Sequence, residues 1–215
     1  MQLFYYTVIK KENIMNYPDF FNKVPNIELI DPLSAVLGTF EKGELNISYL
    51  DVVKGSGHSC PTVAGAYLMS YHALKALFPE GPALRGSIKV EFNEKMEEGT
   101  TGVVANAISY ITGATDKSGF KGLNGNFSRH SLMSFNMPVP FVRFSRTDTN
   151  QSVDLFYDPS PVPADSKQMG LMKMIMQGTA SEKEKKDFAE LWQERVKRIL
   201  VDNFDNPKIL RVEIL

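Results

Sequence analysis

The sequence predicts an α+β fold, with a mixed or antiparallel central sheet packed with helices and a helical C-terminal extension. Apolar residues alternate with a period of two, as in half-buried strands, mainly in the middle of the chain. Apolar spacings of three and four residues, typical of amphipathic helices, dominate towards both ends. Because strands and helices are segregated along the chain, this pattern favours α+β over a regular βαβ alternation.

The composition excludes several classes of protein. Hydrophobic residues make up 43% of the 215 residues and charged residues 23%, as in soluble globular proteins. The formal net charge of −1 gives no electrostatic basis for binding nucleic acid or an anionic membrane. No apolar run approaches the roughly 20 residues of a membrane helix, and the N-terminal apolar run precedes its lysines, the reverse of a secretory signal. We therefore expect a cytoplasmic protein, and Met15 is an alternative start.

The first segment, residues 1–40, is predicted to be a helical lead-in. Phe20, Phe21 and Val24 would share one face of a helix there. Within the same segment, residues 31–38 have the proline near the start and the glycine at the end that are typical of a short helix.

The second segment, residues 41–160, is predicted to be the α+β core. Its longest helix is expected at 61–78, where small and apolar residues follow helical spacing. Residues 103–111 form an apolar run too short to distinguish strand from helix. Alternating segments predict strands at 44–50, 86–93, 131–135, 140–146 and 153–158.

The third segment, residues 161–215, is predicted to be a helical extension packed on the core. Helices are expected at 169–176 and at 181–200, the second with Ser181 as its N-terminal cap. A final strand is expected at 208–214.

The stretch Gly55–Pro61 combines the features of a site. It contains the only cysteine of the chain, Cys60, and one of its three histidines, His58. Thiolate and imidazole are good ligands for zinc and other transition metals, and a helix that begins at Pro61 would direct its free N–H groups towards the sulfur. A single cysteine excludes an internal disulfide and any zinc site that needs two thiolates from one chain.

The same two residues permit other interpretations. Cys60 could be a metal-free nucleophile with His58 as its base. The pair could also belong to a module that binds a small ligand or haem, since His and Cys are both axial ligands of haem iron. A structural cysteine beside a structural histidine is the remaining alternative.

Further polar residues are candidates for the same site. His130 follows a glycine-rich loop and could be a third metal ligand or a base. Asp116 could ligate a metal, and Lys117 could hold an anionic substrate. Asn106 and Tyr110 lie in an apolar run, where polar groups need partners, so they could line a pocket. Each of these residues also has a structural alternative as part of a solvated turn or a satisfied core.

Two blocks of the sequence resemble a known family. Residues 57–61, Gly-His-Ser-Cys-Pro, followed by a helix of small residues, resemble the Gly-His-x-Cys-Pro signature of the FmdE family, which is named for its association with formylmethanofuran dehydrogenase. Residues 106–115 resemble its Asp-Ala-Ile…Thr-Gly-Cys-Thr segment. Residues 117–122 and 131–135 resemble the Gly-Lys-Gly run and the strand that follow, so the resemblance covers about 45–146.

The resemblance implies an α+β core with a metal or catalytic site around the His-x-Cys motif, and a homodimer. The protein would then be a metal-binding accessory factor or a metal-dependent enzyme acting on a small-molecule ligand, with zinc as the expected metal. The expected metal ligands are His58, Cys60, His130 and Asp116. The expected catalytic residues are Cys60, His58 and Lys117. The expected cofactor-binding residues are Asn106, Tyr110, Thr112 and His130.

The chain also departs from the family pattern. Ala114 stands where the family often has a second cysteine, and Asn106 where it often has aspartate. No cysteine follows Cys60, so the C-terminal zinc finger found in many members is absent. A redox role based on a cysteine pair is therefore not expected.

Overall fold

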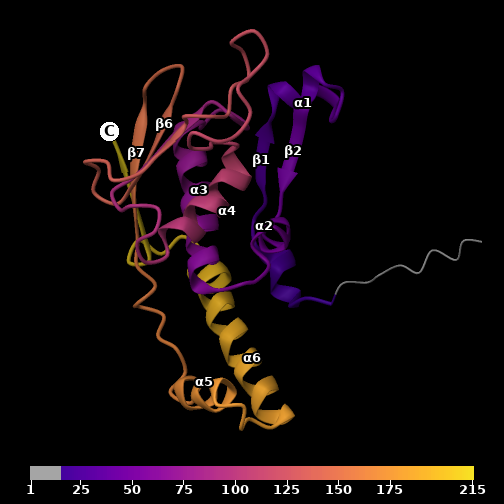
Figure 1. Cartoon of the computed structure of the whole chain (residues 1–215), viewed down its shortest axis with the longest axis vertical. Helices are drawn as coiled ribbons and strands as arrows, with labels where there is room; N and C mark the ends of the chain where they lie inside the picture. The colour runs from indigo at the N-terminus through magenta and orange to yellow at the C-terminus, as the bar shows by residue number, and fades with distance from the viewer. Residues whose placement is uncertain (1–15) are drawn as a thin grey trace, which may run out of the picture.

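The computed structural model describes residues 16–215, which form an α+β structure with six α-helices and eight strands (Figure 1). The predicted fold class is confirmed, but the strands form two sheets instead of one. The helices are α1 (Pro32–Val36), α2 (Tyr49–Ser56), α3 (Pro61–Leu77), α4 (Thr101–Thr112), α5 (Gln168–Met176) and α6 (Glu182–Lys197). The strands are β1 (Ile27–Ile30), β2 (Glu44–Ile47), β3 (Ala83–Leu84), β4 (Ile88–Phe92), β5 (Met133–Ser134), β6 (Val142–Arg146), β7 (Ser152–Tyr157) and β8 (Leu210–Ile214).

Helix α3 is the centre of the core. Cys60 is its N-cap and Pro61 occupies its first turn, where the missing N–H of proline costs nothing. Most of its residues are buried, from Val63 to Leu77, because it contacts α2 and α4 on one side and β6, β7 and β8 on the other. Figure 1 shows α3 running through the body between the larger sheet and the strands β1 and β2.

The larger sheet is mixed and has the strand order β5-β4-β6-β7-β8. Its pairs are antiparallel except for β4 with β5, and Phe144 at its centre pairs with Val90 and Val153. These apolar residues are fully buried, whereas the opposite face carries the ion pair of Arg143 and Asp154. The alternation that predicted the strands is therefore an alternation between a core face and a polar face.

The N-terminal segment differs from the predicted helical lead-in. A 3₁₀ helix at Asp19–Lys23 buries Phe20 and Phe21, but Ile27–Ile30 is strand β1 of a second sheet with the order β2-β1-β3. Ile27 and Leu29 face the core while Glu28 is exposed, a period of two that is too short to stand out from the surrounding sequence. The part of this segment before residue 16 lies outside the described residues.

Two further elements differ from the sequence pattern or are left open by it. The strand expected to run to residue 50 ends at Ile47, because Ser48 and Asp51 form a capping box that starts helix α2. The ambiguous run 103–111 belongs to helix α4, which ends at Gly113 in the left-handed conformation.

A buried carboxylate ties three parts of the chain together. Asp31 caps α1 by accepting hydrogen bonds from the amides of Leu33 and Ser34. Its Oδ2 also accepts from Arg85 at 3.0 Å, and its Oδ1 from Arg129 at 2.6 Å. Arg85 in turn donates to two backbone carbonyls at the end of α4. The cluster therefore fixes β1, α4 and the loop before β5 relative to one another.

The Asp31 cluster should make stability depend on pH. Burial favours the protonated carboxyl, but the hydrogen bonds from Arg85 and Ser34 and the two guanidinium charges hold the pKa of Asp31 below its ordinary value. A lowered folded-state pKa stabilises the protein above the unfolded pKa of about 3.9 and ceases to do so as pH falls through the folded value. We expect Asp31→Asn to lose about 3–5 kcal/mol of unfolding free energy at neutral pH, because it leaves the buried Arg129 and the half-buried Arg85 without their counterion.

The measurement is urea denaturation of both proteins at a series of pH values from neutral downwards. The difference between wild type and Asp31→Asn should shrink in acid, and a difference that is constant with pH would contradict the role given to this carboxylate. Glu213→Gln, which removes an exposed ion pair with Arg211, is the control and should change little at any pH.

Candidate functional site

The His-x-Cys motif lies in the short connection between α2 and α3. Helix α2 ends at Gly57, whose φ of 76° is the left-handed conformation that glycine adopts without strain. The chain therefore turns sharply at this point, and His58 follows outside the helix. Two residues later Cys60 begins α3, and its Sγ accepts a hydrogen bond from the amide of Val63 at 3.4 Å. The sulfur thus lies at the positive end of a 17-residue helix, as the sequence predicted.

The two potential ligands differ in exposure. Cys60 is only 8% exposed, whereas the His58 side chain is exposed. His58 Nδ1 lies 3.0 Å from the carbonyl oxygen of Ser56, which fixes the proton on Nδ1 and leaves Nε2 as the basic nitrogen. Within residues 16–215, Nε2 has no hydrogen-bond partner. A backbone carbonyl that orients one imidazole nitrogen while the other remains free is the usual arrangement around a ligating histidine.

Ser59, between the two ligands, is held by three side chains. Its carbonyl oxygen accepts hydrogen bonds from Trp192 Nε1 at 2.9 Å and from Gln193 Nε2 at 3.2 Å, both on α6. Its hydroxyl lies 2.9 Å from the hydroxyl of Tyr49 on α2. Ser59 itself is buried, so these bonds are shielded from water. The backbone of the motif is therefore fixed between α2 and α6.

A fourth contact holds the residue after the cysteine. Tyr157, at the end of β7, donates its hydroxyl to the carbonyl oxygen of Pro61 at 2.7 Å. Its ring lies directly over Gly65, where an added Cβ atom would overlap the ring carbons. The small residues of α3 predict that another element approaches this helix closely, and at Gly65 the structure confirms it. Glycine at this position lets the strand reach the first turn of α3.

The two tyrosines near the sulfur remain protonated. Burial raises the pKa of Tyr49 well above its ordinary value, opposed by the hydrogen bond with Ser59 and reinforced by the negative charge of a Cys60 thiolate. Burial also raises the pKa of Tyr157, opposed by the charge of Arg195 and reinforced by Tyr49 and Cys60. Both hydroxyls are therefore neutral at physiological pH.

The residues predicted on the second block have mixed positions. Tyr110 lies close to the motif, because its ring would be 3.4 Å from a Cβ atom on Gly55. Tyr110 is 44% exposed and Asn106, one helical turn before it on α4, is also exposed. Thr112 is fully buried, and its hydroxyl donates to the carbonyl oxygen of Ile108, so it supports the end of α4.

The remaining predicted residues lie together in a separate loop region. Asp116 Oδ1 accepts hydrogen bonds from the hydroxyl and amide of Ser118, and these bonds hold the pKa of Asp116 below its ordinary value. Its carbonyl oxygen accepts from the amide of Ser131, next to His130. His130 Nδ1 lies 3.0 Å from the hydroxyl of Ser131, and Lys117 is exposed.

The structure thus separates the predicted residues into two groups. His58 and Cys60 lie just before and at the start of α3, and Tyr110 lies against Gly55 at the end of α2. Asp116 and His130 lie in the loop region before β5. Within the described residues 16–215, no group of three or more His, Cys, Asp or Glu side chains is placed to hold a metal ion. The expected set of four metal ligands therefore stays a prediction. Within it, His58 and Cys60 are close together in the sequence.

Sequence reasoning does not identify the residues that hold the motif. Tyr49, Tyr157 and the α6 pair come from three elements that no local pattern connects, and the apolar stripe of α6 marks Trp192 as an ordinary core residue. The available signal is the glycine at position 65, which indicates a close approach without naming the partner.

A family model with the description "FmdE, Molybdenum formylmethanofuran dehydrogenase operon" matches residues 56–206, which is more than two thirds of the chain. The chain belongs to the FmdE family. The match begins at the His-x-Cys motif and extends through α6, beyond the range 45–146 that carries the resemblance. It therefore includes Trp192 and Gln193 with the motif that they hold.

No curated protein matches this FmdE-family chain. Among its described residues 16–215, none of the helices combines the length and the apolar composition required to cross a membrane.

The close approach at Gly65 can be tested by adding one methyl group. Gly65→Ala places a Cβ atom against the ring of Tyr157, and such overpacking costs about 1–3 kcal/mol, more than the ~1 kcal/mol gained in helix propensity. We expect a net loss of unfolding free energy, measured by urea denaturation. Gly81→Ala, with open space around its added Cβ, should be nearly neutral. Equal effects of the two substitutions would contradict the steric explanation.

The hydrogen bonds to Ser59 can be tested through the single cysteine. Trp192→Phe keeps an aromatic ring but removes the N–H donor, and the loss of a hydrogen bond worth about 1 kcal/mol should raise the rate of Cys60 alkylation about fivefold. Tyr17→Phe, which removes an exposed hydroxyl bonded to Asn22, is the control. An unchanged alkylation rate in Trp192→Phe would show that α6 does not restrain the motif.

Proposed function

We propose that this FmdE-family protein binds a transition-metal ion, zinc in the first instance, through His58 Nε2 and Cys60 Sγ. The observation that carries the proposal is the bond between His58 Nδ1 and the carbonyl oxygen of Ser56. This bond sets the tautomer in which Nε2 is free to ligate a metal ion. His58 also lies two residues before Cys60, whose sulfur is at the N-terminus of α3.

The donor set fits part of a metal site, which the described residues 16–215 do not complete. One imidazole and one thiolate are suitable ligands for zinc, but a zinc ion takes four. Water, His130, Asp116 or a second chain would supply the remaining positions. A bound ion would provide Lewis-acid chemistry at a position open to a small-molecule ligand.

The chain's own residues determine the rigidity of this site. Trp192 and Gln193 donate to the backbone carbonyl of Ser59, and the hydroxyl of Tyr49 bonds to the Ser59 hydroxyl. Tyr157 of β7 donates to the backbone carbonyl of Pro61. Ligating atoms that are restrained before the ion arrives lose less conformational freedom on binding. On the solvent side, exposed Tyr110 adjoins the end of α2 and would be available to contact a small-molecule ligand.

The geometry favours this role over a free nucleophilic cysteine. Cys60 is 8% exposed, so a bulky substrate would have little access to its sulfur. The family description names the operon of molybdenum formylmethanofuran dehydrogenase. In line with it, we propose that the protein serves such an enzyme as a metal-binding accessory factor or catalyses a metal-dependent step itself.

Elemental analysis of the purified protein tests metal binding directly. We expect a transition metal in wild type and its loss in both His58→Ala and Cys60→Ser, because two ligands cannot be reduced to one without a large fall in affinity. Lys117→Ala, a change at an exposed loop residue, is the control. His130→Ala shows whether the loop histidine is a third ligand, and an absorption spectrum separates zinc from haem.

Retention of the wild-type metal content in Cys60→Ser would contradict the proposal. The same conclusion follows if wild type, purified without chelators and supplied with zinc, binds no ion.

A further inference from the structure

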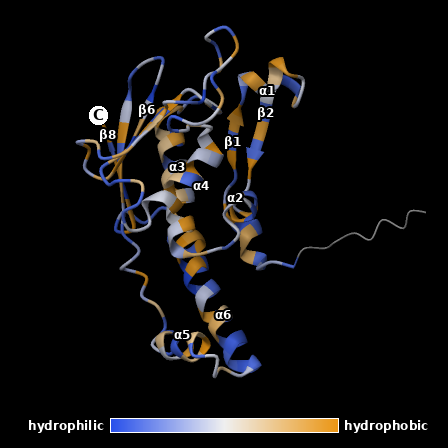
Figure 2. Cartoon of the chain, in the orientation of Figure 1, coloured by the Kyte–Doolittle hydropathy of each residue, from blue (hydrophilic) through white to orange (hydrophobic). Residues whose placement is uncertain are grey.

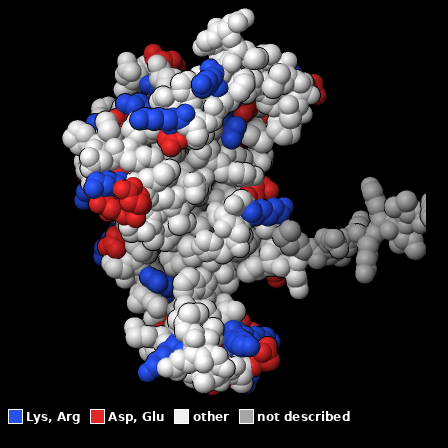
Figure 3. Space-filling view, viewed as in Figure 1, with Lys and Arg blue, Asp and Glu red and all other residues white. Residues whose placement is uncertain are grey.

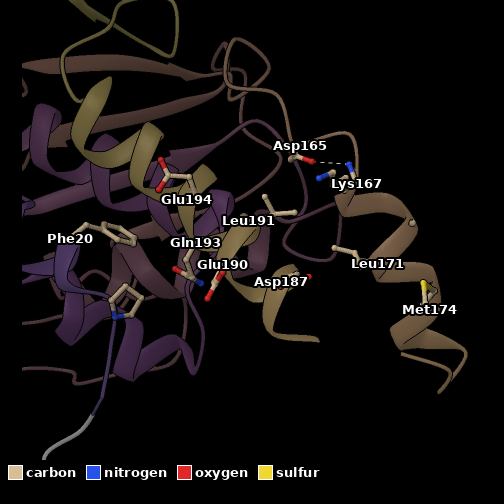
Figure 4. Close-up of a pocket in the computed structure, with 12 residues that line it drawn as sticks. Phe20, Asp165, Lys167, Leu171, Met174, Asp187, Glu190, Leu191, Gln193 and Glu194 are labelled. Atoms are coloured by element: carbon tan, nitrogen blue, oxygen red, sulfur yellow. Dashed lines mark hydrogen bonds between the residues drawn. The ribbon is translucent and has the colours of Figure 1, made fainter. Parts of the chain in front are cut away.

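Some buried polar atoms of the described residues 16–215 have no hydrogen-bond partner there, and they fall into two pairs. One pair consists of the amide oxygens of Gln168 in α5 and Gln193 in α6. Gln193 lines a groove of about 870 Å³ between these helices (Figure 4). The other pair is Ser34 Oγ and Arg129 Nη1, and both of these residues bond to Asp31. The second pair therefore belongs to one cluster of charged residues.

Asp31 holds the two residues of this pair next to each other. Its Oδ1 accepts hydrogen bonds from the backbone amide of Ser34 at 3.2 Å and from Arg129 Nη2 at 2.6 Å. Because both groups bond to the same oxygen, the Ser34 side chain and the guanidinium of Arg129 are neighbours. Ser34 is 8% exposed and Arg129 is 6% exposed, so neither side chain is open to bulk water.

Both groups need an acceptor. A guanidinium has N–H donors and no acceptor, and a serine hydroxyl has one proton to donate. Asp31 is already fully engaged, because Oδ1 also accepts from the amide of Leu33 and Oδ2 accepts from Arg85. A buried donor that lacks an acceptor is costly, and most of all when it is charged.

The cluster also carries one positive charge in excess, since Arg85 and Arg129 share the single carboxylate of Asp31. Arg85 bonds in addition to two carbonyl groups at the end of α4, which offset part of its charge. Within the described residues, the guanidinium of Arg129 bonds only to Asp31. Burial lowers the pKa of Arg129, the charge of Asp31 opposes this effect, and the charge of Arg85 adds to it.

The surface charges of the protein are in a different situation. In Figure 3, Lys and Arg side chains lie beside Asp and Glu side chains at several places on the surface, where water and dissolved ions also reach them. The excess charge of Arg129 is enclosed, and Figure 2 shows hydrophobic colour over much of β1 and α1, on either side of Asp31. Its counterion therefore has to lie inside the cluster.

The packing around Arg129 favours a small ion. Its Nη1 lies against Gly86 and Gly113, where an added Cβ atom would overlap this nitrogen. Both glycines have positive φ, so the backbone conformation as well as the close approach requires glycine there. A phosphate group presents three oxygens that each need donors. Two enclosed donors instead suit a single-atom acceptor.

We propose that the Asp31 cluster binds a chloride ion, which accepts hydrogen bonds from Arg129 Nη1 and from the hydroxyl of Ser34. The ion supplies the acceptor that both donors need and balances the excess charge of the two arginines. A water molecule would meet the first need and not the second. The ion would connect α1 with the loop before β5, and it would do so whether or not His58 and Cys60 bind a metal.

Urea denaturation of the full chain tests the proposal, in sodium chloride and in sodium gluconate of equal ionic strength. Gluconate is too large for the site, so the comparison separates binding from general screening. A dissociation constant of about 0.1 M would lower the unfolding equilibrium constant about sixfold in about 0.5 M chloride. Equal unfolding curves in the two salts would overturn the proposal.

Two serine variants locate the effect. Ser34→Ala removes one donor and keeps every charge, so the difference between the two salts should shrink. Ser70→Ala is the matched control, because Ser70 is also buried but its hydroxyl already donates to the carbonyl oxygen of Ala66 at 2.8 Å. Its difference between the salts should equal that of wild type. A chloride effect that is unchanged in Ser34→Ala would mean that the ion binds elsewhere.

Crystals of the full chain soaked in bromide test the position of the ion directly. Bromide replaces chloride and scatters X-rays anomalously, so we expect an anomalous peak within hydrogen-bond reach of Arg129 Nη1 and Ser34 Oγ. Density without an anomalous signal at this position would identify a water molecule and overturn the proposal.

Discussion

The backbone carbonyl of Ser59 is the point on which the arrangement of the site depends. It is buried between two potential ligands and takes both of its hydrogen bonds from α6, more than 130 residues along the chain. Without Trp192 and Gln193 the carbonyl oxygen of this buried residue would lack its hydrogen-bond partners, which is costly. The C-terminal helix is therefore part of the site, although it contributes no ligand. The family match, which extends through α6, is consistent with a unit that includes both.

Helix α3 connects this point to the rest of the fold. Its first turn carries the cysteine, and its next turn is where Tyr157 of β7 crosses at Gly65. The larger sheet therefore contacts the start of α3 through the Tyr157 hydroxyl, and the absence of a side chain at Gly65 makes room for the Tyr157 ring. At the far side, the Asp31 cluster fixes the end of α4, the helix that presents Tyr110 towards Gly55. Both sheets thus contribute to the position of a two-residue motif.

The sequence predicts what local patterns encode. The alternation of β6 and β7, the capping box of α6 at Ser181 and the helix after Cys60 can all be predicted, because each depends on neighbouring residues. Strand β1 is not predicted because its four residues are too few to show an alternating pattern. Helix α2 is not predicted because its capping residues, Ser48 and Asp51, resemble the end of a strand. The hydrogen bonds to Ser59 join residues distant in sequence, and a backbone acceptor leaves no trace in the side-chain pattern.

The position of Trp192 has a practical consequence. It is the only tryptophan in the chain, and its indole N–H is bonded to the residue between His58 and Cys60. When tryptophan is excited selectively over the eight tyrosines, the intrinsic fluorescence of the protein therefore comes from one indole bonded to the motif. Its emission wavelength and quenching will follow events at His58 and Cys60 without any attached label, so that ligands can be screened by titration in a cuvette.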